Sequence, residues 1–333
     1  MSTRDMTFAR PLRILLSAKA RDRLGQEIAA VMDGRRFELV TASPARGGEP
    51  VDVDVAFITR DVTGRSTKHR VLETLESFYT SLRGSPALRW VHVHSTGADR
   101  PIFAELKARD VRVTTSSGAN AEVVAQTALG CVLAMARRFP MLFRAQQRHE
   151  WSPLMGEALP VDLPGQSALV VGWGPIGKRI AQFLRMLEVT VIVARTRAEP
   201  AAAGLQTIAY ESLGDVAGRI DWLILACPLT DRTRGLVDAR IFGALKRGAR
   251  LVNVARGEIV NEGDLVEALR DGRLAGASLD VFEFEPLDAA SPLWDMENVF
   301  VMPHSAGHSD GNEGRVDRIF LAYLRELIGS MER

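Results

Sequence analysis

Short apolar runs alternate with segments of helical periodicity along nearly the whole chain, and this alternation restricts the fold more than any other feature. Successive parallel strands need a crossover connection, usually a helix, so the alternation is typical of parallel α/β sheets. The first set of predicted strands lies at 13–17, 37–40, 53–59, 89–94 and 111–115, with helices predicted at 24–32, 67–82 and 100–107. We expect these residues to form one α/β unit of about flavodoxin size.

A second α/β set begins at Ser167. Its predicted strands lie at 168–171, 190–194, 222–226, 250–254, 277–281 and 299–302, and its predicted helices at 176–187, 240–245 and 263–270. Six strands with short connections fit a dinucleotide-binding domain. A long helix at 119–137, which Pro140 is expected to end, precedes this set, and an irregular segment runs from there to Pro164. An amphipathic helix at 311–328 follows it.

The composition is that of a soluble globular protein, and the length suggests about two domains. The chain has 333 residues, 46% hydrophobic and 25% charged, and its net charge of +1 points to neither nucleic acid nor an anionic membrane as a partner. Two cysteines, Cys131 and Cys227, are too few for a disulfide framework or a metal cluster, so we expect no metal and a reducing compartment. The N-terminus, with Arg4, Asp5 and Arg10, lacks the apolar core of a signal peptide, and we expect a cytoplasmic location.

The segment from Ala168 to Ala181 reads as a strand, a Gly-x-Gly-x-x-Gly turn and a helix. In such a turn the first glycine permits a tight bend, the second lets the backbone approach a pyrophosphate, and the third lets the helix pack on the strand. The helix N-terminus adds N–H groups and a positive dipole. We therefore predict a dinucleotide site here, against the alternative of a purely structural turn, at Gly172, Gly174, Pro175, Ile176 and Gly177.

The end of the next strand bears on the choice of dinucleotide. An acidic side chain normally accepts hydrogen bonds from the ribose diol of NAD at this place, but the sequence reads Arg195, Thr196, Arg197. A guanidinium pairs well with a 2′-phosphate. The sequence therefore favours NADP(H) over NAD(H), with a solvated loop arginine at Arg195 as the alternative.

Three strand ends in the second half carry polar side chains that suit a reaction centre. Arg256 follows one buried strand, Glu285 follows the next, and His304 follows the last. A guanidinium clamps a carboxylate and polarises an adjacent ketone, whereas an imidazole exchanges a proton near neutral pH, and a paired carboxylate orients it. Each residue alone has a structural explanation. Together, on the strand ends of a dinucleotide domain, they predict a catalytic set.

From about Trp90 to Gly307 the sequence resembles the D-isomer-specific 2-hydroxyacid dehydrogenases, including glyoxylate and hydroxypyruvate reductases. Several motifs in the same order carry the resemblance, and they lie at 118–126, 171–177, 227–236, 251–260, 276–286 and 298–304.

The resemblance implies a Rossmann-type doubly wound parallel sheet inserted into a second, flavodoxin-like α/β domain. The expected parts are a substrate-binding domain at 1–117, a dinucleotide-binding domain at 118–304, and a helix at 305–333 that returns to the first domain. It also implies a homodimer, with the arm around Trp151 as the dimerising part.

The resemblance implies roles for individual residues as well. Arg256, Glu285 and His304 match the family's catalytic set, with Glu285 rather than Glu283 as the acid because it immediately precedes Pro286. The loop 94–98 resembles the one that holds the substrate carboxylate, which implies Thr96 and Gly97. The residues implied in cofactor binding, with Asp280 at the nicotinamide, are Cys227, Pro228, Thr233, Val254, Ala255 and Asp280.

Some positions depart from the family or stay open. No glycine ends the helix near Leu187 and Glu188, so another cap must form there. Arg60, Arg100 and His308 lie where a substrate contact is conceivable, with a surface position as the alternative for each.

The sequence thus predicts an NADP(H)-dependent oxidoreductase for a small 2-keto or 2-hydroxy acid such as glyoxylate or hydroxypyruvate. Two alternatives stay open: a corepressor-like protein that uses the dinucleotide as a signal, and a dehydrogenase of another small anion such as formate or phosphite.

Overall fold

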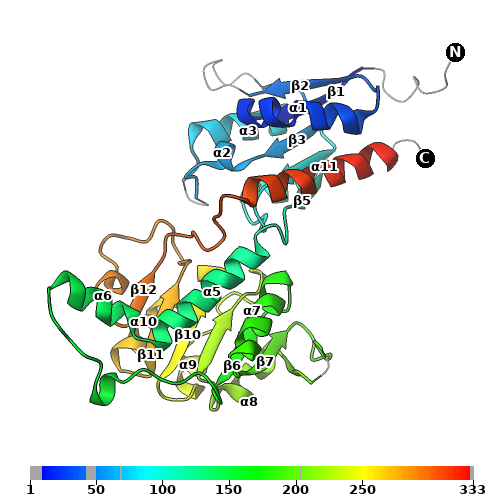
Figure 1. Cartoon of the computed structure of the whole chain (residues 1–333). Helices are drawn as coiled ribbons and strands as arrows, with labels where there is room; N and C mark the ends of the chain where they lie inside the picture. The colour runs from blue at the N-terminus through cyan, green and yellow to red at the C-terminus, as the bar shows by residue number, and fades with distance from the viewer. Residues whose placement is uncertain (1–9, 43–49, 68–69, 203, 331–333) are drawn as a thin grey trace. The chain divides into compact units, whose positions relative to one another are not determined.

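The computed structural model describes residues 10–42, 50–67, 70–202 and 204–330 (Figure 1). Arg4, Asp5 and part of the predicted helix at 67–82 lie outside these residues. The chain divides into two compact units, unit 1 (Met1–Asn120 with Ser309–Arg333) and unit 2 (Ala121–His308). These borders lie a few residues beyond the predicted 117 and 304, because helix α5 begins only at Ala121 and the residues after His304 pack with unit 2.

The described residues of unit 1 form a five-stranded parallel sheet with the order β2-β1-β3-β4-β5. Its strands are β1 (Leu12–Leu16), β2 (Phe37–Thr41), β3 (Val55–Ile58), β4 (Trp90–Val93) and β5 (Arg112–Thr115). Its helices are α1 (Ala18–Met32), α2 (Arg60–Thr63), α3 (Glu73–Gly84), α4 (Pro101–Lys107) and α11 (Asn312–Ser330).

Helix α1 begins six residues earlier than the predicted position 24. The Ser17 side chain caps it by accepting a hydrogen bond from the N–H of Ala20 at 3.0 Å. The charged residues of the first turns conceal this start from an analysis of apolar periodicity.

A buried core lies on each face of the unit 1 sheet, and the side chains that alternate along a central strand enter one core or the other. On β1, Leu12, Ile14 and Leu16 face one core together with α1 and α11, whereas Leu15 faces the other. Helix α11 closes the first core: Phe320 stacks on Phe57 with ring centroids 4.3 Å apart. The chain's last described helix is therefore an integral part of unit 1.

The described residues of unit 2 form a seven-stranded parallel sheet with the order β12-β11-β10-β9-β6-β7-β8. Its strands are β6 (Ser167–Val171), β7 (Thr190–Arg195), β8 (Gln206–Ala209), β9 (Trp222–Leu225), β10 (Ala249–Asn253), β11 (Leu274–Leu279) and β12 (Val299–Val301). Strand β8 was not predicted, because this edge strand is short and begins with polar residues. The order reverses at β6, which has β7 on one side and β9 on the other, and this makes the sheet a doubly wound Rossmann type.

Helices cover both faces of this sheet in Figure 1. They are α5 (Ala121–Ala136), α6 (Phe139–Gln147), α7 (Pro175–Met186), α8 (Leu213–Ala217), α9 (Ala239–Ala244) and α10 (Glu262–Arg270), and short 3₁₀ turns lie at Gly156–Ala158, Tyr210–Ser212, Gly257–Ile259 and Pro292–Trp294. Two buried clusters flank the sheet, with Leu169 and Val171 of β6 in one and Ala168 and Val170 in the other. No helix within the described ranges is long and apolar enough to cross a membrane.

The prediction of an irregular segment from 140 to 164 is wrong in its first part, where α6 forms. Arg138 adopts a left-handed conformation (φ 59°) that separates α5 from α6, and Pro140 lies in the first turn of α6. Proline is favoured at that position, because the missing N–H has no partner in the helix anyway. Pro140 therefore helps to begin a helix rather than to end one.

The C-terminus of α7 shows how a helix ends without glycine. Glu188 takes the left-handed conformation (φ 57°) that glycine usually occupies. The N–H of Val189 donates to the carbonyl of Leu184, and the N–H of Glu188 donates to the carbonyl of Arg185, each at 3.1 Å. This is the hydrogen-bond pattern of a Schellman motif.

Candidate functional site

The glycine turn after β6 is closely packed on one side and open on the other. Gly172 has a φ of 111°, and a Cβ atom on it would lie 2.6 Å from the carbonyl oxygen of Ala226. A Cβ atom on Gly177 would lie 2.0 Å from the carbonyl oxygen of Gly172. By contrast, a Cβ on Gly174 would meet nothing within 4 Å. The first glycine thus lets the turn pack against the backbone that follows β9, the third lets α7 pack against the turn, and the second leaves a space beside the backbone.

Helix α7 begins at this space, with Gly174 as its N-cap and Pro175 in its first turn. The first N–H groups of a helix, here those of Ile176 and Gly177, have no partner inside the helix. No acidic side chain lies in the first turn. Open space, unpartnered donors and a positive helix end fit the pyrophosphate of a dinucleotide.

The end of β7 is rich in positive charge. Arg195 is half-buried, whereas Thr196 and Arg197 are exposed. Arg232 also lies here, although the sequence did not predict it. Its guanidinium donates to the carbonyl oxygen of Thr196 at 3.2 Å and pairs with Glu211. No local pattern marks Arg232, because the fold alone brings it to the end of β7.

Most residues implied in cofactor binding lie at the carboxyl ends of β9 and β10. Cys227, Thr233, Val254 and Ala255 are all buried, and Pro228 is exposed. The Thr233 hydroxyl donates to the carbonyl of Pro228 at 2.7 Å and accepts from the N–H of Thr230 at 2.8 Å, which fixes the turn after Cys227. Burial raises the pKa of the Cys227 thiol to about 12, so this thiol is neutral.

Arg256 follows β10 on a turn held by Asn253, another residue that the sequence analysis did not single out. The Asn253 side chain accepts from the N–H of Ala255 at 3.0 Å and donates to the carbonyl of Arg256 at 3.1 Å. The half-buried Arg256 guanidinium donates to the carbonyl of Ala255 at 2.7 Å.

Glu285 and His304, predicted from separate strand ends, are in contact. The His304 Nδ1 and the Glu285 Oε2 are 2.8 Å apart, and the Glu285 Oε1 accepts from the N–H of Phe282 at 3.2 Å. Burial raises the pKa of Glu285, but the bond to His304, the Phe282 N–H and the Arg256 charge together hold it below its usual value. Glu285 is therefore ionised at neutral pH.

Gly257 brings two of these strand ends together, and the sequence analysis gave it no role. A Cβ atom on Gly257 would lie 1.8 Å from the carbonyl carbon of Phe282 and 2.0 Å from its oxygen. Only glycine permits this approach. The backbone that carries Arg256 therefore touches the backbone that binds Glu285.

Asp280 holds the turn that carries His304. Its side chain is almost fully buried (2% exposed) and accepts from the N–H of Ser305 at 2.7 Å and of Ala306 at 3.0 Å. Its carbonyl oxygen accepts from the N–H of His304 at 2.9 Å. Burial raises the pKa of Asp280, although these N–H groups oppose the rise. The expected contact with a nicotinamide stays a prediction.

The loop 94–98 of unit 1 is braced by its own side chains. The Thr96 hydroxyl donates to Asn120 Oδ1 at 2.9 Å, and the Ser95 hydroxyl donates to the carbonyl of Gly97 at 2.6 Å. Among the described residues, no acceptor pairs with the backbone N–H of Thr96 or Gly97. This loop thus offers two donors.

The three residues left open by the sequence analysis have different surroundings. The Arg100 guanidinium donates to the carbonyls of Ser66 and Thr67 at 2.7 and 2.9 Å, so it binds backbone groups within unit 1. Arg60 is exposed at the start of α2, and the His308 N–H donates to the carbonyl of Ser305 at 2.9 Å.

Comparisons with known proteins find relatives both in sequence and in fold. The sequence profile described as "D-isomer specific 2-hydroxyacid dehydrogenase, NAD binding domain" matches residues 129–306. A glyoxylate/hydroxypyruvate reductase A from Arabidopsis thaliana is 35% identical over 220 residues, which are 66% of this chain and 68% of that protein.

Two solved structures are similar across nearly the whole chain. A D-isomer specific 2-hydroxyacid dehydrogenase from Xanthobacter autotrophicus, in complex with NADPH and MES, is 29% identical with a TM-score of 0.73, covering 97% of this chain and 95% of that one. An NADPH-dependent glyoxylate/hydroxypyruvate reductase from Sinorhizobium meliloti, in complex with NADP and malonate, is 27% identical with a TM-score of 0.71, covering 94% and 92%.

The matched profile, the curated relative and the doubly wound sheet with its glycine turn lead to one assignment. The chain belongs to the D-isomer specific 2-hydroxyacid dehydrogenase family, and it is an NAD(P)-binding oxidoreductase that acts on CH–OH donors.

Proposed function

We propose that the protein is an NADPH-preferring reductase of a small 2-keto acid, such as glyoxylate or hydroxypyruvate, that also runs in reverse. The observation that carries the proposal is the 2.8 Å contact between His304 Nδ1 and Glu285 Oε2. The positive charge of Arg256 lies near this pair and helps to lower the pKa of Glu285. A proton donor, an orienting carboxylate and a carboxylate-binding cation are the groups that reduction of a keto acid needs.

His304 is the proposed proton donor. Its Nδ1 is used by Glu285, so the remaining ring nitrogen, Nε2, is the one that gives a proton to the keto oxygen. Ionised Glu285 fixes the orientation of the ring through this contact. Asp280 acts through the backbone, since it holds the turn of residues 304–306 in place.

Arg256 and the loop 94–98 are the proposed carboxylate-binding groups. The guanidinium of Arg256 offers two parallel N–H donors, which suit a carboxylate and polarise the adjacent carbonyl. The N–H groups of Thr96 and Gly97, which have no acceptor among the described residues, offer a second pair of donors. A small 2-keto acid has both the carboxylate and the carbonyl that these groups recognise.

The proposed cofactor is NADP(H), whose nicotinamide supplies the hydride to the keto carbon when bound. Gly172, Gly174, Pro175, Ile176 and Gly177 hold its pyrophosphate at the start of α7. The proposed walls of the site come from the carboxyl ends of β9 and β10, and Asp280 would contact the nicotinamide of the bound cofactor. The proposed wall residues are Cys227, Pro228, Thr233, Val254 and Ala255.

Preference for NADP(H) rests on the positive end of β7. Arg195, Thr196 and Arg197 present two cations and a hydroxyl, and Arg232 adds a third cation beside Thr196. A 2′-phosphate pairs with such a cluster, whereas a ribose diol needs an acceptor. Relatives in complex with NADPH and NADP support this preference.

We also propose a homodimer and a cytoplasmic location. Large apolar side chains are exposed on α6 and the arm that follows: Phe143 is 59%, Met155 71% and Trp151 98% exposed. Exposed apolar surface of this kind suits a contact with a second copy. Two free, buried cysteines suit a reducing compartment.

The test is NADPH oxidation with a panel of 2-keto acids by the wild type and by Arg256→Ala. Loss of the guanidinium should lower kcat/KM by about 10²–10³-fold, because transition-state contacts of this kind contribute that much. The binding of NADPH should persist, and Arg240→Ala, an exposed arginine on α9, should behave as the wild type. Unchanged turnover in Arg256→Ala would reject the assignment.

A second measurement addresses the cofactor. The ratio of kcat/KM with NADPH to that with NADH should exceed one in the wild type and should fall below one in Arg195→Asp. A wild type that prefers NADH would contradict the proposed role of the cations at the end of β7.

A further inference from the structure

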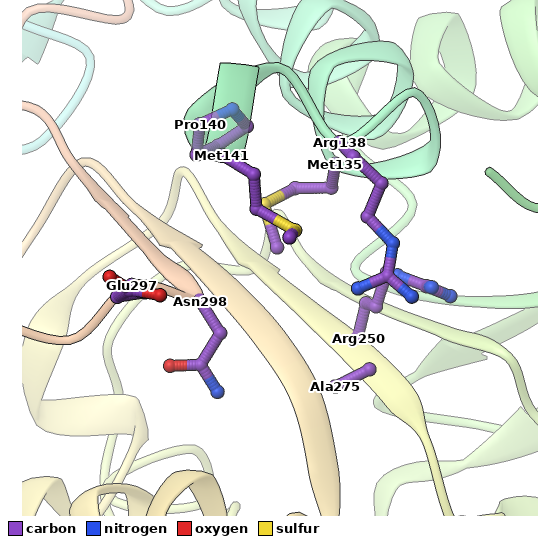
Figure 2. A pocket seen from close by; sticks show the side chains of 8 residues that line it. All are labelled: Met135, Arg138, Pro140, Met141, Arg250, Ala275, Glu297 and Asn298. Atoms are coloured by element: carbon purple, nitrogen blue, oxygen red, sulfur yellow. The ribbon is translucent and has the colours of Figure 1, made fainter. Parts of the chain in front are cut away.

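A cavity of about 190 Å³ lies in unit 2 at the amino ends of β10 and β11, where α5 meets α6 (Figure 2). Its walls are partly apolar, from Met135, Met141 and Ala275, and partly polar, from Arg138, Arg250 and Asn298. Arg250 is the second residue of β10, whereas Arg256 follows the other end of that strand. This cavity is therefore separate from the site proposed for the substrate.

Arg250 is the unusual group in this cavity. Its side chain is only 6% exposed, and its guanidinium lies 5.2 Å from the centre of the Trp222 ring. Within the described part of the chain, its side chain makes no hydrogen bond and no ion pair with another residue. Burial lowers the pKa of Arg250, and the neighbouring charge of Arg138 lowers it further. A buried cation without an anionic partner is unfavourable unless a ligand supplies one.

Among the residues that the structure describes, the carboxylates near Arg250 do not fill this role. The negative charge of Asp221 raises the pKa of Arg250 in part. The Asp221 carboxylate is already used, however, since it pairs with Lys246 at 2.6 Å and accepts from the N–H of Ser167 at 2.9 Å. Glu297 also lines the cavity, but its side chain is 73% exposed and lies 4.0 Å from Arg144.

A second guanidinium stands next to the first. Figure 2 shows the side chains of Arg138 and Arg250 converging, with their charged ends side by side at one wall of the cavity. The left-handed backbone of Arg138 (φ 59°), between α5 and α6, places it there. Two adjacent like charges repel each other, and an oxyanion that accepts hydrogen bonds from both removes that repulsion.

We propose that this cavity binds a small organic acid, whose carboxylate sits between Arg250 and Arg138. The short carbon chain of the acid then contacts Met135, Met141 and Ala275, and the amide of Asn298 offers a further hydrogen bond to its polar groups. The apolar walls favour an organic acid over a fully hydrated inorganic anion.

The methionines of the cavity allow a direct test. The full-length protein, with its methionine methyl groups labelled with ¹³C, is saturated with NADP and titrated with succinate, and the same titration is run with the neutral succinamide. The Met135 and Met141 signals, assigned by Met→Leu variants, should move along a saturable curve with succinate and stay in place with succinamide. Signals of the remaining methionines, out of ten in the chain, serve as internal controls.

Variants then decide which groups bind the anion. Arg250→Gln and Arg138→Gln should each raise the half-saturating succinate concentration at least tenfold, whereas Arg185→Gln, an exposed arginine on α7, should leave it unchanged. In Arg256→Gln the cavity titration should persist, which separates it from the substrate site. If burial makes Arg250→Gln unable to fold, Arg138→Gln carries the test. Methionine signals that do not titrate with succinate, or that keep the wild-type half-saturating concentration in both Arg250→Gln and Arg138→Gln, would overturn the proposal.

Discussion

The substitution Gly257→Ala should displace the residues of the proposed site while it leaves every charged side chain in the sequence unchanged. The new methyl carbon would start 1.8 Å from the carbonyl carbon of Phe282, whereas real Cβ atoms essentially never come within 3.0 Å of such an atom. The two backbones must therefore separate by more than 1 Å. Phe282 donates its N–H to Glu285 at 3.2 Å, so the separation moves Glu285 relative to Arg256.

Two effects of different size follow from that shift. Misplacement by about 1 Å lowers the rate of a positioned reaction by about 10²-fold, so kcat/KM for glyoxylate should fall by that factor. Overpacking of this kind also lowers the free energy of unfolding by about 1–3 kcal/mol. The affinity for NADPH should fall less than kcat/KM, because the glycine turn proposed to hold the pyrophosphate lies on β6 and α7, and only the part of the proposed cofactor site around Val254 and Ala255 lies near the displaced backbone.

The assay combines NADPH oxidation, NADPH titration by fluorescence, and thermal unfolding. Gly243→Ala is the matched control: it lies in helix α9, and a Cβ there meets nothing within 4 Å. It should keep full activity and stabilise the protein by about 0.5–1 kcal/mol. A Gly257→Ala variant with the activity and melting temperature of the wild type would refute the packing argument.

Three further predictions concern single buried or strained groups. His92 is fully buried between Thr114 and Ser116, and burial lowers its pKa from 6.5 to about 3, so the unfolded chain binds its proton more tightly. Stability should fall as the pH drops from 6.5 towards 3, by about 2 kcal/mol at pH 5, and denaturant titrations of His92→Gln should lack this slope between pH 7 and 5. Glu188→Gly should raise the free energy of unfolding by about 1 kcal/mol in the same assay, because glycine adopts a positive φ without strain; a loss would contradict the cap described for α7. The Cys227 thiol, with its pKa raised to about 12, should not react with a thiol reagent at pH 8 until the protein unfolds, and rapid labelling of the native protein would show that it is not buried.

Much of the fold could be predicted from the sequence, because most strands are buried on both faces and read as continuous apolar runs. Strands β6, β9 and β10 lie within one residue of their predicted positions. Strand β8 was missed because it is short and begins with polar residues, and the first turns of α1 were missed because their charged residues interrupt the apolar periodicity. Helix α6 was missed because proline often marks the end of a helix, whereas Pro140 lies in the first turn of one.

The catalytic residues of the proposed site could be predicted from the sequence, whereas the residues that position them could not. Arg256, Glu285 and His304 each follow a recognisable strand, so parallel strand order alone places them at one edge of the sheet. Gly257 and Asn253 were not predicted. Gly257 matters because it lies against the backbone of Phe282, and Asn253 because it bonds to the backbone of Ala255 and Arg256. Neither contact leaves a pattern in the sequence. Arg232 escaped for the same reason, since it contacts a loop 36 residues away.

The division of the chain into a first unit built from both ends and a second built from the middle has a consequence during translation. Residues 1–120 emerge first, yet Phe320 and Leu324 of α11 belong to their core. The central unit has all of its residues available earlier, so it can fold while the apolar face around Leu12 and Phe57 still awaits its covering helix. The core of unit 1 can thus be completed only after all of unit 2 has been synthesised, and a nascent chain stalled near residue 308 would expose this face to chaperones.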